Sequence, residues 1–149
     1  MRNHPRITGF LLQALTHEYT AVQQYLTQSS LCSLWGLAEW AGSFRNEARE
    51  ELDHAGMLAQ HLLLLGVAPG AGQMRPPRPG RDLLEMLEQD RDIEAAAVDL
   101  YAEALAFAHR IREERVAHLF ARLLQDEQEH LQHLDGMIVR LESGGYSNV

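Results

Sequence analysis

Apolar residues recur at intervals of three and four over most of this chain. The spacing is clear at Leu83, Leu84 and Leu87, and again at Leu119 and Leu123. Intervals of this kind place the apolar side chains on one face of an α-helix. No segment alternates convincingly between apolar and polar residues with period two, so the sequence predicts helices and no strand.

Glycine and proline divide the chain into helical segments. They gather in "GVAPGAGQMRPPRPG", residues 66–80, which cannot be helical because proline lacks the backbone N–H and fixes φ. Elsewhere they are sparse within the periodic segments. We therefore predict one domain over residues 1–149, with four long helices at roughly 6–34, 38–65, 82–110 and 114–142.

The connections between these helices predict the topology. Short turns near Trp35-Gly36 and Arg112-Glu113 make the first two and the last two helices antiparallel hairpins. Residues 66–80 are long enough to reach ~50 Å, whereas a 28-residue helix is about 42 Å long. The predicted fold is therefore an all-α, ferritin-like four-helix bundle with a long crossover between the second and third helices. The alternative is a disordered linker between two subdomains, although neither hairpin alone would bury its apolar stripe.

Composition limits the classes of function. The net charge of −8 leaves no basic stripe for phosphates, which argues against a nucleic-acid partner. The longest apolar run, "LLLLGVA", is far too short to span a membrane, and the first ten residues do not resemble a signal peptide. Cys32 is the only cysteine, so no intrachain disulfide can form. We expect a cytoplasmic protein with no membrane partner.

A motif of Glu followed three residues later by His occurs twice, in segments that have the pattern of inner helix faces. The second copy lies 76 residues after the first. A further glutamate stands 33 residues before each copy, so these two glutamates share the same offset. The six residues are Glu18, Glu51 and His54 in the first half, and Glu94, Glu127 and His130 in the second.

The hairpin geometry predicts that these residues meet. Residues equidistant from the turn of an antiparallel hairpin lie level with each other, and the midpoints between each glutamate and its motif fall near positions 35 and 111, at the predicted turns. Glu18 and Glu94 also interrupt lines of mostly apolar residues spaced by seven, so their side chains should point inward. The six residues should therefore converge about halfway along the bundle.

Metal binding explains why these carboxylates can be buried. Four buried carboxylates without a Lys or Arg partner would be very unfavourable, whereas two divalent cations would offset their charge and leave one imidazole for each metal. Oxygen and nitrogen ligands suit Fe or Mn, and the thiolates typical of structural zinc sites are absent. Either motif alone would be interpreted as a solvated helix face, but two copies with one offset favour a site for two Fe per chain, with Mn as the alternative.

Other residues accompany the six at the same offset. Glu50 and Asp126 precede the two motifs and could accept the second ring N–H of a ligand histidine across the bundle; the alternative is that they are surface acids. Tyr25 and Tyr101 could hydrogen-bond a ligand or supply an electron, or could simply pack in the core. Cys32 should be a small core residue. We expect the remaining histidines to be solvated or interfacial: His4, His17, His61, His109, His118 and His133.

Longer stretches of the sequence resemble the bacterioferritin family. They are "LTHEYTAVQQYLTQSSLCSLWGL", "EELDHAGMLAQHLLLLGVAP", "EMLEQDRDIEAAAV" and "LLQDEQEHLQHLD", which contain all six candidate ligands, and the similarity covers about residues 8–142. The resemblance implies a ferroxidase that binds Fe(II) in pairs, oxidises it with O₂ or peroxide, and passes ferric product to a mineral core inside a shell of about 24 subunits.

The chain also departs from the family pattern. Family members bind haem through a Met at the position where this chain has Leu52, and Met57 lies too far along the helix to replace it. We therefore expect no haem coordinated in the family manner. The short fifth helix of the family has no counterpart in "ESGGYSNV", so the homo-oligomer could be a 24-subunit shell or a dimer. Asn46 stands where some members have an inner-surface histidine.

Three functions remain open on the sequence. The first is a ferroxidase that stores or detoxifies iron. The second is a ferritin-like di-iron or di-manganese peroxidase or oxidase that stores no iron, although one cysteine cannot build the rubredoxin-type site of a rubrerythrin. The third is a subunit that co-assembles with a haem-bearing bacterioferritin chain.

Overall fold

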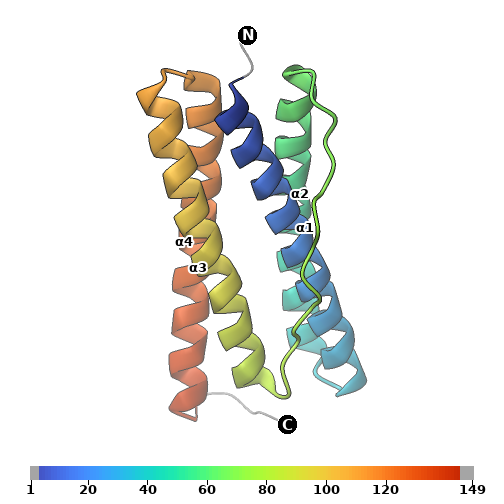
Figure 1. The fold of residues 1–149 in the computed structure, drawn as a ribbon. Helices are drawn as coiled ribbons and strands as arrows, with labels where there is room; N and C mark the ends of the chain where they lie inside the picture. Colours follow the sequence, from blue (N-terminus) through green and yellow to red (C-terminus); the bar gives the residue numbers. More distant parts are fainter. Residues whose placement is uncertain (1–3, 145–149) are drawn as a thin grey trace.

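The computed structural model describes residues 4–144 and contains four long helices (Figure 1). Within that range there is no strand, which confirms the prediction of an all-α bundle. None of the helices described is both long and apolar enough to cross a membrane. Residues 1–3 and 145–149 lie outside the described residues, so the prediction that "ESGGYSNV" forms no fifth helix stays a prediction. The helices are α1 (Pro5–Leu34), α2 (Ala38–Leu64), α3 (Leu83–Arg110) and α4 (Glu114–Glu142).

The helix ends lie within one residue of the predicted bounds. α1 begins at Pro5 rather than residue 6, because the His4 ring accepts a hydrogen bond from the Arg6 backbone N–H at 3.1 Å and acts as the N-cap. α3 begins at Leu83 rather than residue 82, because the Asp82 carboxylate caps the helix by accepting from the Glu85 N–H at 2.9 Å. α2 ends at Leu64 rather than residue 65.

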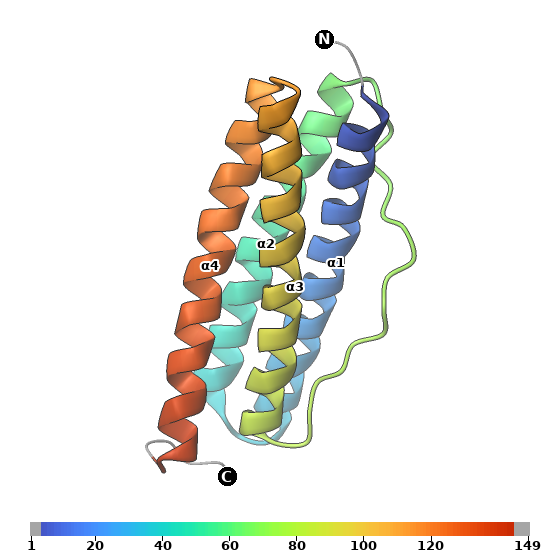
Figure 2. The same cartoon turned by 60° about the vertical axis from the view of Figure 1, so that its left-hand side comes forward.

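The crossover between α2 and α3 runs the length of the bundle beside α1 (Figures 1 and 2). Three glutamines of α1, which we call the glutamine clamp (Gln23, Gln24 and Gln28), bind its backbone. Gln23 donates to the Arg75 carbonyl at 2.5 Å, and Gln24 binds both the N–H and the carbonyl of Arg78 at 2.7 and 2.5 Å. Gln28 donates to the Pro79 carbonyl at 3.1 Å. The crossover is therefore an ordered part of the fold and not a linker between subdomains.

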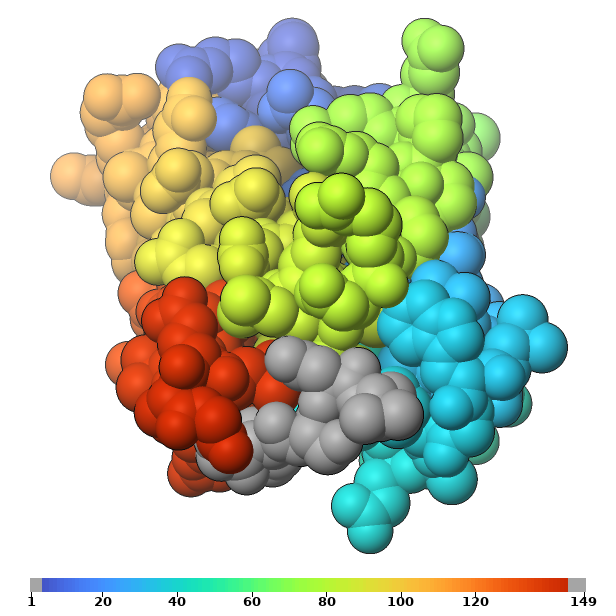
Figure 3. Space-filling view, turned by 90° about the horizontal axis from the view of Figure 1, so that it is seen from below, coloured from blue at the N-terminus to red at the C-terminus, as the bar shows by residue number. Residues whose placement is uncertain are grey.

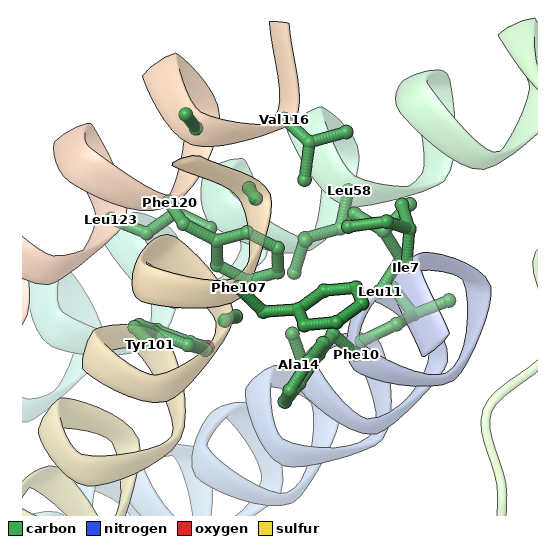
Figure 4. Close-up of a cluster of buried hydrophobic side chains, with 14 of the residues drawn as sticks. Ile7, Phe10, Leu11, Ala14, Leu58, Tyr101, Phe107, Val116, Phe120 and Leu123 are labelled. Atoms are coloured by element: carbon green, nitrogen blue, oxygen red, sulfur yellow. The ribbon is translucent and has the colours of Figure 1, made fainter. Parts of the chain in front are cut away.

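Buried apolar residues form two clusters, one toward each end of the bundle. The first lies at the end where α1 begins and includes Leu11, Phe107 and Phe120 (Figure 4). The second includes Phe44 and Leu87 and lies toward the other end, where the crossover (green) packs near the α1–α2 turn (Figure 3). Cys32 is fully buried in the second cluster, as predicted. The polar centre described below lies between the two clusters and is enclosed by them.

Replacing Gly80 by alanine should destabilise the end of the crossover. Gly80 has φ +97°, and a Cβ on it would lie 2.7 Å from the Met86 backbone nitrogen in α3. The strain and the clash together should lower the free energy of unfolding by about 1–3 kcal/mol, measured by chemical denaturation. Gly42→Ala in α2 is the matched control, since a Cβ there meets nothing within 4 Å and should stabilise the helix by about 1 kcal/mol. If Gly80→Ala were as stable as the wild type, the expected strain and clash of a side chain at residue 80 would be contradicted.

Candidate metal centre

Four helices each bring a glutamate to the same buried layer in the middle of the bundle. All four glutamates are fully buried, and the two histidines that accompany them are nearly so. Their ligand atoms form two groups, and within each group these atoms all lie within 4.8 Å of one another. Glu51 and Glu127 belong to both groups. The groups are Glu18, Glu51, His54 and Glu127, and Glu51, Glu94, Glu127 and His130.

The two halves of the centre have matching geometry. His54 Nδ1 lies 3.1 Å from a Glu127 oxygen, and His130 Nδ1 lies 3.2 Å from a Glu51 oxygen. The same nitrogens lie 3.6 Å from Glu18 and 3.9 Å from Glu94. Each histidine therefore faces the glutamate of the other motif as well as a glutamate from α1 or α3, so that neither hairpin alone forms the centre.

Most of the inward atoms of this layer have no hydrogen-bond partner. These atoms are both oxygens of Glu51, both of Glu127, and one oxygen each of Glu18 and Glu94. Among residues 4–144, the Nδ1 atoms of His54 and His130 also have no hydrogen-bond partner. Oxygens lie close to them, but not in a direction that allows a hydrogen bond. Buried polar atoms without partners are rare and cost free energy. Six oxygens and two nitrogens directed at one enclosed space match the ligands that two divalent cations require.

Without metal, protons compensate part of the charge. Burial, followed by the charges of neighbouring carboxylates, raises the pKa of Glu51 and of Glu94 well above the usual range. Burial alone would lower the pKa of His54, but the close Glu127 and Glu18 carboxylates raise it to about 11. Burial also favours a high pKa for Glu127, yet the close Glu94 and His54 side chains and the charge of His130 hold it at about 2. A cation must therefore displace protons from this layer when it binds.

Two acids hold the outer nitrogens of the histidines. His54 Nε2 lies 2.9 Å from an Asp126 oxygen, and His130 Nε2 lies 2.5 Å from a Glu50 oxygen. Each acid comes from the helix that carries the other motif. A hydrogen bond from Nε2–H to a carboxylate leaves Nδ1 with its lone pair toward the centre, which is the tautomer that a metal needs.

Two buried tyrosines contact the outer glutamates. Tyr25 donates to Glu94 Oε1 at 2.5 Å, and Tyr101 donates to Glu18 Oε1. The sequence suggested only that each tyrosine could hydrogen-bond a ligand, and did not indicate which one. Because α1 and α3 are antiparallel, each tyrosine lies level with the glutamate of the opposite helix. In each of these glutamates the second oxygen remains unpartnered and is free to bind a cation.

Comparison with known proteins agrees with this geometry. A family model described as a ferritin-like domain matches residues 9–143. A bacterioferritin of Rhodobacter capsulatus is 33% identical over 138 residues, which are 93% of this chain and 86% of that protein. This chain belongs to the bacterioferritin family. Bacterioferritins of Mycolicibacterium paratuberculosis and Streptomyces coelicolor are each 29% identical, over 97% and 99% of this chain and 91% and 88% of theirs.

Within this bacterioferritin fold, the position of the family's haem ligand is exposed. Leu52 lies on the outer face of α2 with 52% of its surface exposed. It lines a hollow of about 180 Å³ together with Leu26, Arg45 and Arg49. A leucine side chain has no donor atom for iron. That no haem is coordinated at this position stays a prediction.

An acidic opening leads from the surface to the centre between α2 and α4. We call it the acidic mouth (Glu50, Asp53, Asp126 and Glu129). It has a volume of about 310 Å³, and His54, His130, Met57 and Arg122 complete its lining. An opening lined by carboxylates raises the local concentration of cations.

Two predictions about histidines were wrong, and one acid of the bacterioferritin centre was missed. His61 is buried and His17 is largely buried against Tyr101, because both belong to faces that pack on neighbouring helices. Glu47 lies 3.7 Å from His130 Nε2, and burial raises its pKa. The candidate residues were identified by their recurrence at an offset of 76, and Glu47 was missed because the residue at this offset is Leu123. Its position one helical turn before Glu51 was the available signal.

Asp126→Asn should weaken Fe(II) binding about 10- to 100-fold, because loss of the carboxylate charge weakens the control of the His54 tautomer. Anaerobic titration of Fe(II) into the metal-free chain measures this affinity. Asp53→Asn is the matched control, since it removes the same charge from the acidic mouth without contacting a histidine. Equal losses in the two variants would show that only the charge of the mouth matters.

Proposed function

We propose that the chain is a ferroxidase of the bacterioferritin type, which oxidises Fe(II) to Fe(III) with O₂ or peroxide for iron storage or detoxification. The observation that carries the proposal is the set of eight unpartnered oxygen and nitrogen atoms in the buried layer. Their number and their chemistry fit two iron ions per chain, with Mn as an alternative metal. Membership of the bacterioferritin family supports the same function.

The grouping of the ligand atoms suggests a role for each residue. Glu51 and Glu127 belong to both groups, so they would bridge the two ions and hold them close together. Glu18 and His54 would complete one position, and Glu94 and His130 the other. When bound, a pair of Fe(II) ions supplies electrons to an oxidant that reaches both of them.

The surroundings support this chemistry without taking part in it directly. Tyr25 and Tyr101 fix one oxygen of each outer glutamate and leave the other oxygen for iron. Four carboxylates offset the charge of two divalent ions, which removes the cost of burying either set alone. The acidic mouth would attract Fe(II) from solution and lead it to the two histidines.

Membership of the family supports an oligomer, and we propose that it is a homo-oligomer. We propose a 24-subunit shell around the mineral, with a dimer as the smaller alternative. No haem is expected, because Leu52 replaces the ligand Met.

An anaerobic Fe(II) titration of the metal-free protein, followed by exposure to O₂, tests the proposed function. We expect a fast oxidation phase that saturates at two Fe per chain, and then slow uptake of further iron into a soluble particle. Saturation at two Fe with precipitation of later iron would indicate a di-metal redox enzyme that stores no iron. Absence of a fast phase would contradict the ferroxidase and leave the site to manganese.

A further inference from the structure

A polar cleft lies beneath the crossover, in the groove between α1 and α3 and away from the acidic mouth. It consists of two hollows of about 110 and 180 Å³. Both are lined by His17, Thr20 and Arg75, so they adjoin. None of the six candidate metal ligands lines either hollow. The cleft is therefore separate from the proposed metal centre.

The outer wall of this cleft is held rigidly. The glutamine clamp binds the backbone of the crossover at residues 75, 78 and 79. Farther along the crossover, the Gly72 N–H donates to the Thr16 hydroxyl at 2.6 Å. The hydrogen bonds therefore fix the crossover backbone, and with it the points from which the exposed Arg75 and Arg78 side chains reach the cleft, before any ligand binds. Such preorganisation reduces the entropy lost on binding.

The residues that line the cleft carry more positive than negative charge. Arg75 and Arg78 line it, and within residues 4–144 neither guanidinium forms an ion pair. Asp92 is the single acid among the residues around the two hollows. His17 Nε2 is buried and has no hydrogen-bond partner, so the polar wall of α1 also contains an unsatisfied group.

We propose that this cleft binds a small tetrahedral oxyanion of the phosphate class. A guanidinium matches two oxygens of such an ion with paired N–H donors, and two arginines can bind it from different sides. His17 Nε2 would supply a further donor in the tautomer that carries the ring proton on this nitrogen. A cavity of about 150 Å³ accommodates benzene, so the 110 Å³ hollow is large enough for an ion of five heavy atoms. Two guanidinium groups also exclude a metal cation.

Isothermal titration of inorganic phosphate into the full-length, metal-free protein tests the proposal at constant ionic strength. Arg75→Ala and Arg78→Ala should each weaken phosphate binding at least tenfold, and the double variant should abolish it. Arg75→Lys should give an intermediate loss, because lysine keeps the charge but not the paired donors. Arg49→Ala, on the opposite face of α1 and α2, removes the same charge and should bind phosphate within twofold of wild type.

Several outcomes would overturn the proposal. The first is that the wild type shows no saturable phosphate binding. The second is that the Arg75 and Arg78 variants bind phosphate as well as the wild type does. The third is that Arg49→Ala loses as much affinity as they do, which would indicate a general charge effect. Competition by sulfate but not by acetate is expected for a tetrahedral site, and the reverse order would contradict it. Because the protein contains no metal in this experiment, its result is independent of whether the chain oxidises iron.

Discussion

Replacing Glu51 by glutamine should slow the fast phase of Fe(II) oxidation by at least about 100-fold. Glu51 is fully buried, belongs to both groups of ligand atoms, and has two oxygens without partners. Loss of a group that only supports a metal ligand costs 10- to 100-fold in affinity or activity, so loss of a bridging ligand should cost at least as much. Stopped-flow absorbance after mixing with oxygenated Fe(II) measures the rate.

The control for this variant is Glu129→Gln. It makes the same chemical change in the acidic mouth without removing a candidate ligand, so it should slow the fast phase far less than Glu51→Gln, by weakening only the attraction of Fe(II). Glu51→Gln should also melt at or above the wild-type temperature without metal, because it removes a buried acid that has no hydrogen-bond partner. A fast phase of wild-type size in Glu51→Gln would contradict the proposed bridge.

The metal-free protein should lose stability as pH rises from about 7 to 9. In this range folded His54, with a pKa of about 11, keeps a proton that the unfolded chain releases near pH 6.5. A proton bound only in the folded state lowers the free energy of unfolding as pH rises, by about 1.4 kcal/mol per pH unit for one group. The raised pKa values of Glu51 and Glu94 act in the same direction. The low pKa of Glu127 acts in the opposite direction only below pH 4.5, which lies outside this range.

Bound metal should reverse this dependence, because the ligands must give up their protons to bind it. Denaturation with and without Mn(II), followed by circular dichroism between pH 7 and 9, measures both slopes. We expect a negative slope without metal and a flat or positive slope with it. Parallel slopes would show that these protons are not displaced by the metal.

The sequence predicted the helices, the crossover and the meeting of the six residues, because each depends on spacing along the chain. Helical periodicity is local, and a hairpin with a short turn determines which residues lie level. The pairing of Glu50 and Asp126 with histidines across the bundle was predicted, but the exchange of the tyrosines between halves was not. The pairing of Tyr25 with Glu94 depends on how α1 packs against α3, and these helices are far apart in sequence.

The contacts of the polar residues under the crossover were equally hard to predict from the sequence. Gln24 and His17 differ little from surface residues in the sequence, and what they contact depends on where residues 72–79 lie. Burial of His61 likewise results from packing between helices that no local pattern describes. Long-range contacts of this kind determine the electrostatics of the site, and the periodicity of the chain alone contains no information about them.

Because each hairpin supplies partners to the histidine of the other, contacts in the centre join the two halves of the chain. His54 is held by Asp126 and His130 by Glu50, so each half completes the other. Two copies of a single hairpin around a two-fold axis would build the same centre. Joining the copies in one chain allows each half to diverge outside the shared layer. The divergence is visible under the crossover, where Gln24, Gln28 and Asp90 have as their counterparts Leu100, Ala104 and Ala14.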